Sequence, residues 1–109
     1  MRVSDYVQVS TAAPTREAAV KLAEGATAAR LAAGAQVAGP VLSVYWHLGE
    51  QGSSEEWQVL LYTTTDRYPQ LETHLIDAHP WDNPQVTATA VVHASAAYLA
   101  WIKRTVEGG

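Results

Sequence analysis

The sequence predicts an α+β protein with four strands and three helices. Two observations carry this prediction: segments of alternating polarity are interspersed with segments of helical period, and each segment has its own start and stop signals. With 109 residues, 48% of them hydrophobic and 17% charged, the chain is large enough to bury one core. We therefore expect a single domain over residues 1–109, without a linker or an internal repeat.

The first strand is predicted at Tyr6–Ser10, where apolar and polar residues alternate. A helix follows over Arg16–Ala33, and its many alanines allow it to lie close to a sheet. Thr15 is the expected N-cap of this helix, because its hydroxyl can accept from a backbone N–H of the first turn. Gly34 is the expected C-terminal stop.

A long hairpin is predicted next. Its first strand covers residues 35–48 with a bend at Gly39–Pro40, residues 49–56 form a polar connection, and residues 57–65 form the second strand. A domain of this size is too small to cover such a hairpin. Because uncovered apolar strands invite aggregation, we expect a cyclic oligomer in which each hairpin extends a neighbour's sheet.

The remaining elements complete the fold. A second helix is predicted over Asp66–Ala78 with Pro69 in its first turn, then a fourth strand over residues 85–92 and a last helix capped by Ser95. The order is β-α-β-β-α-β with an added C-terminal helix. It is that of the split β-α-β, ferredoxin-like sandwich, a four-stranded antiparallel sheet with two helices on one face.

Composition excludes several classes of function. The chain has no cysteine, so disulfides and thiolate metal sites are excluded. A net charge of −4 argues against a nucleic-acid partner, and we expect Trp46 and Trp57 in packing or subunit contacts instead of base stacking. No segment approaches the roughly 20 apolar residues of a membrane span, and the N-terminus lacks a signal-peptide pattern. We therefore expect a cytoplasmic protein without a membrane partner.

The run "IDAHPWDNPQV", Ile76–Val86, concentrates stiff and polar residues. A sharp corner explains most of it, because Pro80 ends the preceding helix, Pro84 precedes the next strand, and Asp and Asn suit turns. The imidazole of His79, close to an aromatic ring and a carboxylate, is what the corner leaves unexplained.

Four segments of the chain resemble the CutA family of divalent ion tolerance proteins: Val9–Trp46, Glu55–Glu72, His79–Val86 and Ala97–Ile102. The resemblance implies a ferredoxin-like subunit similar to the PII signal proteins. It also implies a homotrimer in which the long hairpin reaches onto neighbouring subunits, and a role in tolerance or binding of divalent cations such as copper.

The chain departs from the family pattern within the polar cleft that the resemblance implies between subunits. Gly34 stands where the family commonly has cysteine, Tyr62 where it usually has lysine, and Gln85 where it usually has a carboxylate. The expected cleft residues are Ser10, Gly34, Tyr62, His79, Trp81, Asp82 and Gln85.

The sequence offers little evidence of chemistry. No catalytic residue is assigned, because the chain has no G-x-S-x-G, H-E-x-x-H or phosphate-loop motif. No two histidines have the i, i+4 spacing of a metal-binding helix, so we expect no obligatory cofactor. If the copper that the resemblance implies is bound, His79 and Asp82 are its candidate ligands. A PII-like regulator that binds a small ligand and a purely structural scaffold remain alternatives.

Overall fold

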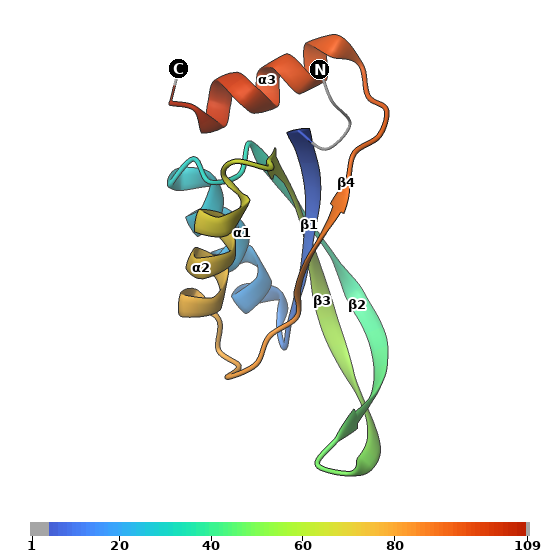
Figure 1. The fold of residues 1–109 in the computed structure, drawn as a ribbon. Helices are drawn as coiled ribbons and strands as arrows, with labels where there is room; N and C mark the ends of the chain where they lie inside the picture. The colour runs from blue at the N-terminus through green and yellow to red at the C-terminus, as the bar shows by residue number, and fades with distance from the viewer. Residues whose placement is uncertain (1–4, 109) are drawn as a thin grey trace.

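The computed structural model describes residues 5–108 as four strands and three helices in the predicted order (Figure 1). Their bounds are β1 Tyr6–Ala13, α1 Arg16–Ala28, β2 Gly34–His47, β3 Glu50–Thr64, α2 Tyr68–Ala78, β4 Val86–Ala90 and α3 Ala96–Val106. The strands form one antiparallel sheet in the order β2-β3-β1-β4. The α+β prediction is confirmed at this level.

The helices are distributed unevenly over the sheet. Helices α1 and α2 lie side by side on one face, which we call the helix face, and α3 crosses one end of the sheet (Figure 1). The β2–β3 hairpin projects beyond both helices at the opposite end. The sheet face that α1 and α2 leave uncovered is called the open face.

The strand register assigns each side chain to a face, since residues directly opposite each other in an antiparallel pair point to the same side. Val9 lies opposite Leu61 and Ala88, and its burial places this row on the helix face. The alternate residues belong to the open face: Tyr6, Gln8, Ser10, Ala12, Gly34, Gln36, Ala38, Gln58, Leu60, Tyr62, Thr64, Thr87 and Thr89.

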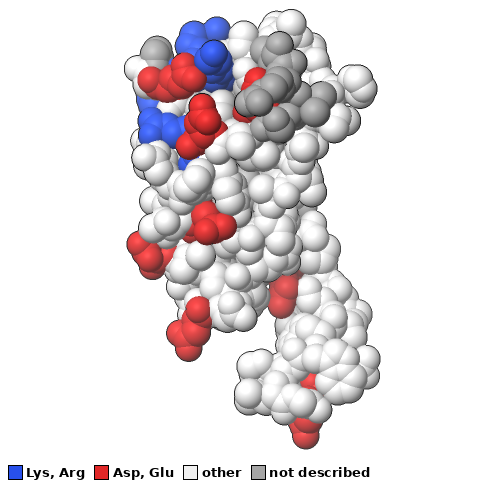
Figure 2. All heavy atoms as spheres, in the orientation of Figure 1, with Lys and Arg blue, Asp and Glu red and all other residues white. Residues whose placement is uncertain are grey.

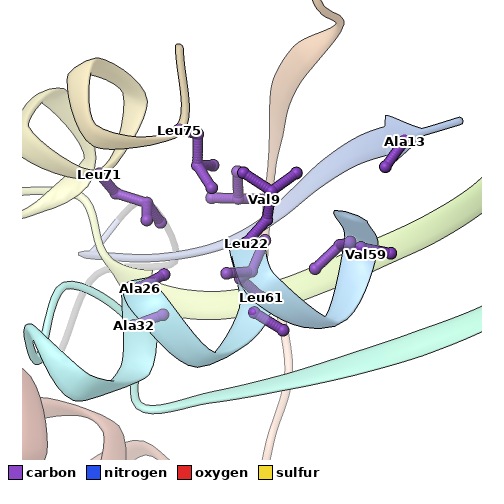
Figure 3. Packing of buried hydrophobic residues seen from close by; sticks show 11 residues of the cluster. Val9, Ala13, Leu22, Ala26, Ala32, Val59, Leu61, Leu71 and Leu75 are labelled. Atoms are coloured by element: carbon purple, nitrogen blue, oxygen red, sulfur yellow. The ribbon is translucent and has the colours of Figure 1, made fainter. Parts of the chain in front are cut away.

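The core lies between the helix face and the two helices (Figure 3). Leu71 and Leu75 of α2 and Leu22 of α1 pack toward Val9 and Leu61, and the two α2 leucines and both sheet residues are fully buried. The other buried residues of α1 are small: Ala19, Ala23 and Ala26. The alanine-rich side of α1 is therefore the side that faces the core.

Helix α1 ends at Ala28, five residues earlier than predicted. Arg30 has a φ of 57°, and the amides of Arg30 and Leu31 donate to the carbonyls of Thr27 and Ala26 at 3.0 Å each. This bonding pattern is a Schellman cap, in which the left-handed residue is usually glycine. The sequence predicted the helix end at Gly34, because Arg30 stands at the position where glycine would have marked the true end. Gly34 instead begins β2.

The predicted bend at Gly39–Pro40 is present as a break in the β2–β3 register between Ala38 and Val41, and the Gly39–Pro40 peptide is cis. The ring of Trp57 lies against Gly39, where an added Cβ would be 2.7 Å from two ring carbons. Only glycine leaves room for this ring. Residues 41–56, beyond the bend, are called the hairpin arm.

The predicted connection over residues 49–56 is wrong. Strand β3 begins at Glu50, and the turn consists of Leu48 and Gly49, with φ values of 53° and 80°. Positive φ at both residues is typical of a type I′ hairpin turn. The polar stretch Glu50–Glu56 was mistaken for a loop because it lacks alternating apolar residues. No helix covers either side of the arm, so this part of β3 needs no apolar residues to pack within the chain.

Three other boundaries differ from the prediction. Strand β1 continues to Ala13, because Ala12 and Ala13 still pair with β3. Helix α2 begins at Tyr68, with Pro69 in its first turn as expected. Strand β4 ends at Ala90, where its pairing with β1 stops. The Thr15 and Ser95 caps are confirmed, since their hydroxyls accept from backbone amides at 3.1 and 3.3 Å.

Candidate functional site

The structure divides the predicted cleft residues into two groups. Ser10, Gly34, Tyr62 and Gln85 belong to the open face, whereas the other three lie at the corner between α2 and β4. Gly34 is directly opposite Tyr62, and Ser10 is directly opposite Thr87. Gln85 joins this group because its Nε2 donates to Thr87 Oγ1 at 3.3 Å.

Two residues of α3 complete the first group. The Tyr98 ring meets the Tyr62 ring edge to face, with centroids 5.9 Å apart, and its centroid is 5.3 Å from that of Trp101. Trp101 in turn covers Gly34, where an added Cβ would be 3.1 Å from Trp101 Cη2. The indole therefore takes the space that a cysteine side chain at position 34 would enter.

Tyr62 is also tied to the sheet by a side chain that the sequence did not suggest. Gln8 Nε2 donates to the Tyr62 hydroxyl at 2.8 Å, across the β1–β3 pair. The result is an aromatic and amide cluster of Gln8, Tyr62, Tyr98 and Trp101. The i, i+3 spacing of Tyr98 and Trp101 could have indicated that both rings share one face of α3.

The second group is built around the buried imidazole of His79. Its Nε2 donates to the Ala12 carbonyl at 2.6 Å, and its Nδ1 accepts from the Trp81 amide at 3.1 Å. A carbonyl can only accept and an amide N–H can only donate, so these contacts select the neutral tautomer protonated at Nε2. His79 thus fastens the end of α2 to the end of β1.

Trp81 and Asp82 lie further out on the same corner. The Trp81 ring is half-buried, with its centroid 5.1 Å from that of His79 and its plane tilted by 36°. The Asp82 side chain is exposed. The corner is therefore an architectural element in which His79 and Trp81 pack and hydrogen-bond.

Within a single chain, this donor set does not fit a copper site. A ligating imidazole must offer a nitrogen lone pair. In His79, however, Nε2 carries a proton and donates a hydrogen bond to the Ala12 carbonyl, and Nδ1 accepts one from the Trp81 amide. Among residues 5–108, no three His, Asp or Glu side chains are grouped so that they could hold a metal ion.

The open face is free of charge. Its residues carry amides, hydroxyls, aromatic rings or small side chains, and none of those that register places there is Asp, Glu, Lys or Arg. Charge is instead concentrated on the helices and at the α3 end, while the arm is mostly uncharged with a few acidic groups (Figure 2). Depletion of charge is typical of the buried centre of subunit interfaces.

No helix in the described part of the chain combines the length and the apolar character that crossing a membrane requires.

The chain is similar to known proteins over most of its length. The family model "CutA1 divalent ion tolerance protein" matches residues 7–105. The "Divalent-cation tolerance protein CutA" of Thermus thermophilus is 29% identical over 90 residues, which are 83% of this chain and 87% of that protein.

Solved structures agree with the fold. The crystal structure of CutA1 from Oryza sativa has a TM-score of 0.90 at 27% identity and covers 93% of each chain. A structure from Archaeoglobus fulgidus, described as the periplasmic divalent cation tolerance protein CutA, has a TM-score of 0.89 at 22% identity, over 93% of this chain and 98% of that one. The family model spans every strand and helix except the first residue of β1 and the last of α3, so the chain belongs to the CutA1 divalent ion tolerance protein family.

Proposed function

We propose that the protein is a non-enzymatic, cytoplasmic homotrimer of ferredoxin-like subunits with a role in divalent-cation tolerance. Family membership supports the role. The main structural support for the assembly is that a single chain leaves the apolar side of its hairpin arm in solvent. Leu42, Val44 and Trp46 are 71%, 60% and 76% exposed.

These three side chains share one side of the arm, because they alternate along β2. Their cross-strand neighbours Glu55, Ser53 and Gln51 are polar and do not shield them. Leu48, at the turn, is 90% exposed as well. Monomeric soluble proteins rarely expose a contiguous apolar patch of this kind, so a covering partner is expected.

The sheet supports the same proposal in two further ways. Its open face is uncharged, and its outermost strands β2 and β4 each pair on one side only. A ring of identical chains can cover an open face and pair both free edges with one repeated contact, whereas a single chain cannot.

Sedimentation equilibrium at micromolar concentration tests the assembly. We expect a mass of three times the 11.7 kDa chain mass. A mass of one chain over the whole concentration range would contradict the proposal. Cell fractionation with an antibody to the chain tests the cytoplasmic location.

Copper is the candidate cation, with no obligatory cofactor. Binding at His79 requires one ring nitrogen to exchange its hydrogen bond for the metal. If it does so, calorimetric titration of copper into the oligomer should show binding that His79→Ala weakens, with His93→Ala, a change at an exposed loop histidine, as the matched control. Because His79 also fastens the corner, Asp82→Asn provides a second variant that leaves those hydrogen bonds intact. Absence of copper binding by the wild type would remove the metal from the proposal and leave the assembly.

The aromatic and amide cluster favours a second candidate, a PII-like trimer that holds a small ligand between subunits. Tyr62, Tyr98 and Trp101 offer ring surfaces, and Gln8 offers an amide within the same cluster. A thermal-shift screen of nucleotides and small anions against metals separates the candidates. Stabilisation by metals alone would count against the regulator, and stabilisation by neither class would leave a structural scaffold.

A further inference from the structure

The side of the hairpin arm that continues the open face carries a carboxylate held by hydroxyl groups. Ser43 Oγ donates to Glu56 Oε1 at 2.7 Å, and Ser54 Oγ donates to Glu56 Oε2 at 3.4 Å. Tyr45 OH donates to Ser54 Oγ at 3.2 Å. The hydroxyls of both strands therefore fix the orientation of one carboxylate.

Within residues 5–108 this carboxylate has no positive partner. Glu56 is half-buried, and no Lys or Arg of residues 5–108 forms an ion pair with it. A carboxylate can accept about four hydrogen bonds, and the two serines supply only two. Acceptor capacity remains for a further donor.

The location of Glu56 makes this unused capacity significant. Glu56 lies opposite Val41 and continues the β3 row of Gln58 and Tyr62, so it stands where the uncharged open face runs onto the arm. If a second copy covers this face, the carboxylate leaves water. A buried carboxylate without a cation is strongly unfavourable, whereas one with a hydrogen-bonded cation is tolerated.

We propose that Glu56, oriented by Ser43 and Ser54, binds a cationic side chain of a second copy of this chain. The inference rests on the proposed oligomer and identifies a contact within it. A guanidinium fits best, because it donates two parallel hydrogen bonds to a carboxylate. Three exposed arginines whose guanidinium groups form no hydrogen bond or ion pair within the described residues are available: Arg16, Arg30 and Arg104.

Glu56→Gln and Glu55→Gln form a matched pair that tests the proposal. Glutamine retains the shape and an acceptor for Ser43 but lacks the charge, while Glu55 is the adjacent residue on the other side of the arm, opposite Leu42. Sedimentation equilibrium of the full chain should show the assembly midpoint of Glu56→Gln raised about tenfold or more. Its salt dependence should fall. Glu55→Gln removes a charge beside the apolar row of Leu42, so it should leave the assembly midpoint unchanged or lower it.

Each other outcome overturns the inference in a recognisable way. Tighter assembly of Glu56→Gln would show that the wild-type carboxylate is buried in the assembly without a cation and opposes association. An unchanged midpoint would show that the Glu56 carboxylate remains in solvent in the assembly. Dissociation of the wild type by EDTA would identify the cation as a metal ion instead of a side chain. A monomeric wild type would overturn the proposed oligomer itself. Tighter assembly, an unchanged midpoint or dissociation by EDTA would overturn only the proposed contact between Glu56 and a cationic side chain.

Discussion

The two halves of the β2–β3 hairpin follow the same alternating pattern but meet different surroundings. In the inner half, Leu61 and Val59 are fully buried beneath α1 and α2. In the arm, Leu42 and Val44 of β2 occupy the same side and are mostly exposed. Alternation therefore specifies which side of a strand is apolar, but the rest of the structure decides what covers that side.

The tryptophans show the same contrast within one residue type. Trp57 is half-buried against the core, with its ring against Gly39, whereas Trp46 is 76% exposed near the tip of the arm. A large exposed indole is a typical anchor of protein interfaces, since it contributes much area at low cost in side-chain entropy. The contrast separates residues that fold the chain from residues that we expect to join chains.

The largest effect is expected in the inner half. Leu61→Ala removes a fully buried side chain from the middle of the core, so the free energy of unfolding should fall by about 3 kcal/mol. Val44→Ala in the arm, measured below the assembly midpoint, should lower it by less than about 0.5 kcal/mol. Urea unfolding followed by circular dichroism measures both. Equal losses would show that the two halves of the hairpin do not differ.

A smaller effect is expected at the arm, and in assembly instead of folding. Trp46→Ala should weaken association by about 2 kcal/mol, because truncating an interface tryptophan removes an anchor. Sedimentation equilibrium measures the shift in midpoint. Trp46→Phe, which retains an aromatic ring, should restore most of the association, and unchanged assembly of Trp46→Ala would place the indole outside the interface.

The contact between α3 and the sheet should respond more weakly. Gly34→Ala places a methyl group 3.1 Å from the indole of Trp101, so the ring must shift and stability should fall by about 1 kcal/mol. Near-ultraviolet circular dichroism should report the displaced rings of Tyr98 and Trp101. Gly34→Ala should lower the stability less when Trp101 is replaced by Leu. If it lowers the stability equally in both backgrounds, crowding by the indole is not the cause.

The smallest effect is expected at high pH and concerns Tyr68 of α2, which packs against the core that covers the inner half of the hairpin. Burial, followed by the hydrogen bond from the Tyr68 hydroxyl to Glu72 Oε2 at 2.8 Å and the charge of Glu72, raises the pKa of Tyr68 from 10.0 to about 12. The neutral phenol is therefore favoured in the folded state. Its contribution to stability is complete below pH 10 and is lost as the pH rises from 10 to about 12.

Tyr68→Phe tests this linkage. Below pH 10 the variant should be less stable than the wild type by about 0.5 kcal/mol, and the difference should shrink between pH 10 and about 12. Urea unfolding over this pH range measures it. Glu72→Gln should reduce the loss of stability between pH 10 and about 12 without abolishing it, because burial is the largest cause of the raised pKa of Tyr68. A constant difference would contradict the raised pKa.

Much of the fold could be predicted from the sequence because most elements carry local signals. Thr15 and Ser95 cap their helices through their own hydroxyls, and the alanines of α1 indicate the side of the helix that is buried. The errors lie where a residue does what its type rarely does. Arg30 ends α1 in a conformation that favours glycine, and Ser53–Glu56 form a strand although their polarity suggests a loop.

The candidate site was less predictable because it depends on the register of distant strands. Ser10, Gly34 and Tyr62 share the open face of the sheet. Both ring nitrogens of His79, by contrast, form hydrogen bonds that hold the corner together. A sequence identifies His79 as polar but cannot reveal that its Nε2–H donates a hydrogen bond to the Ala12 carbonyl. Tyr98 and Trp101 were missed because apolar helix positions look alike whether they face a core or a sheet.

Hydrogen–deuterium exchange of the hairpin arm above and below the assembly midpoint tests most directly whether other copies cover it. Strand β2 has an unpaired outer edge in the single chain, so its outward amides over residues 41–47 should exchange quickly in dilute protein and in Trp46→Ala. Slowed exchange of those amides in concentrated wild type is the predicted result. Equally fast exchange in material that sediments as an oligomer would contradict the account.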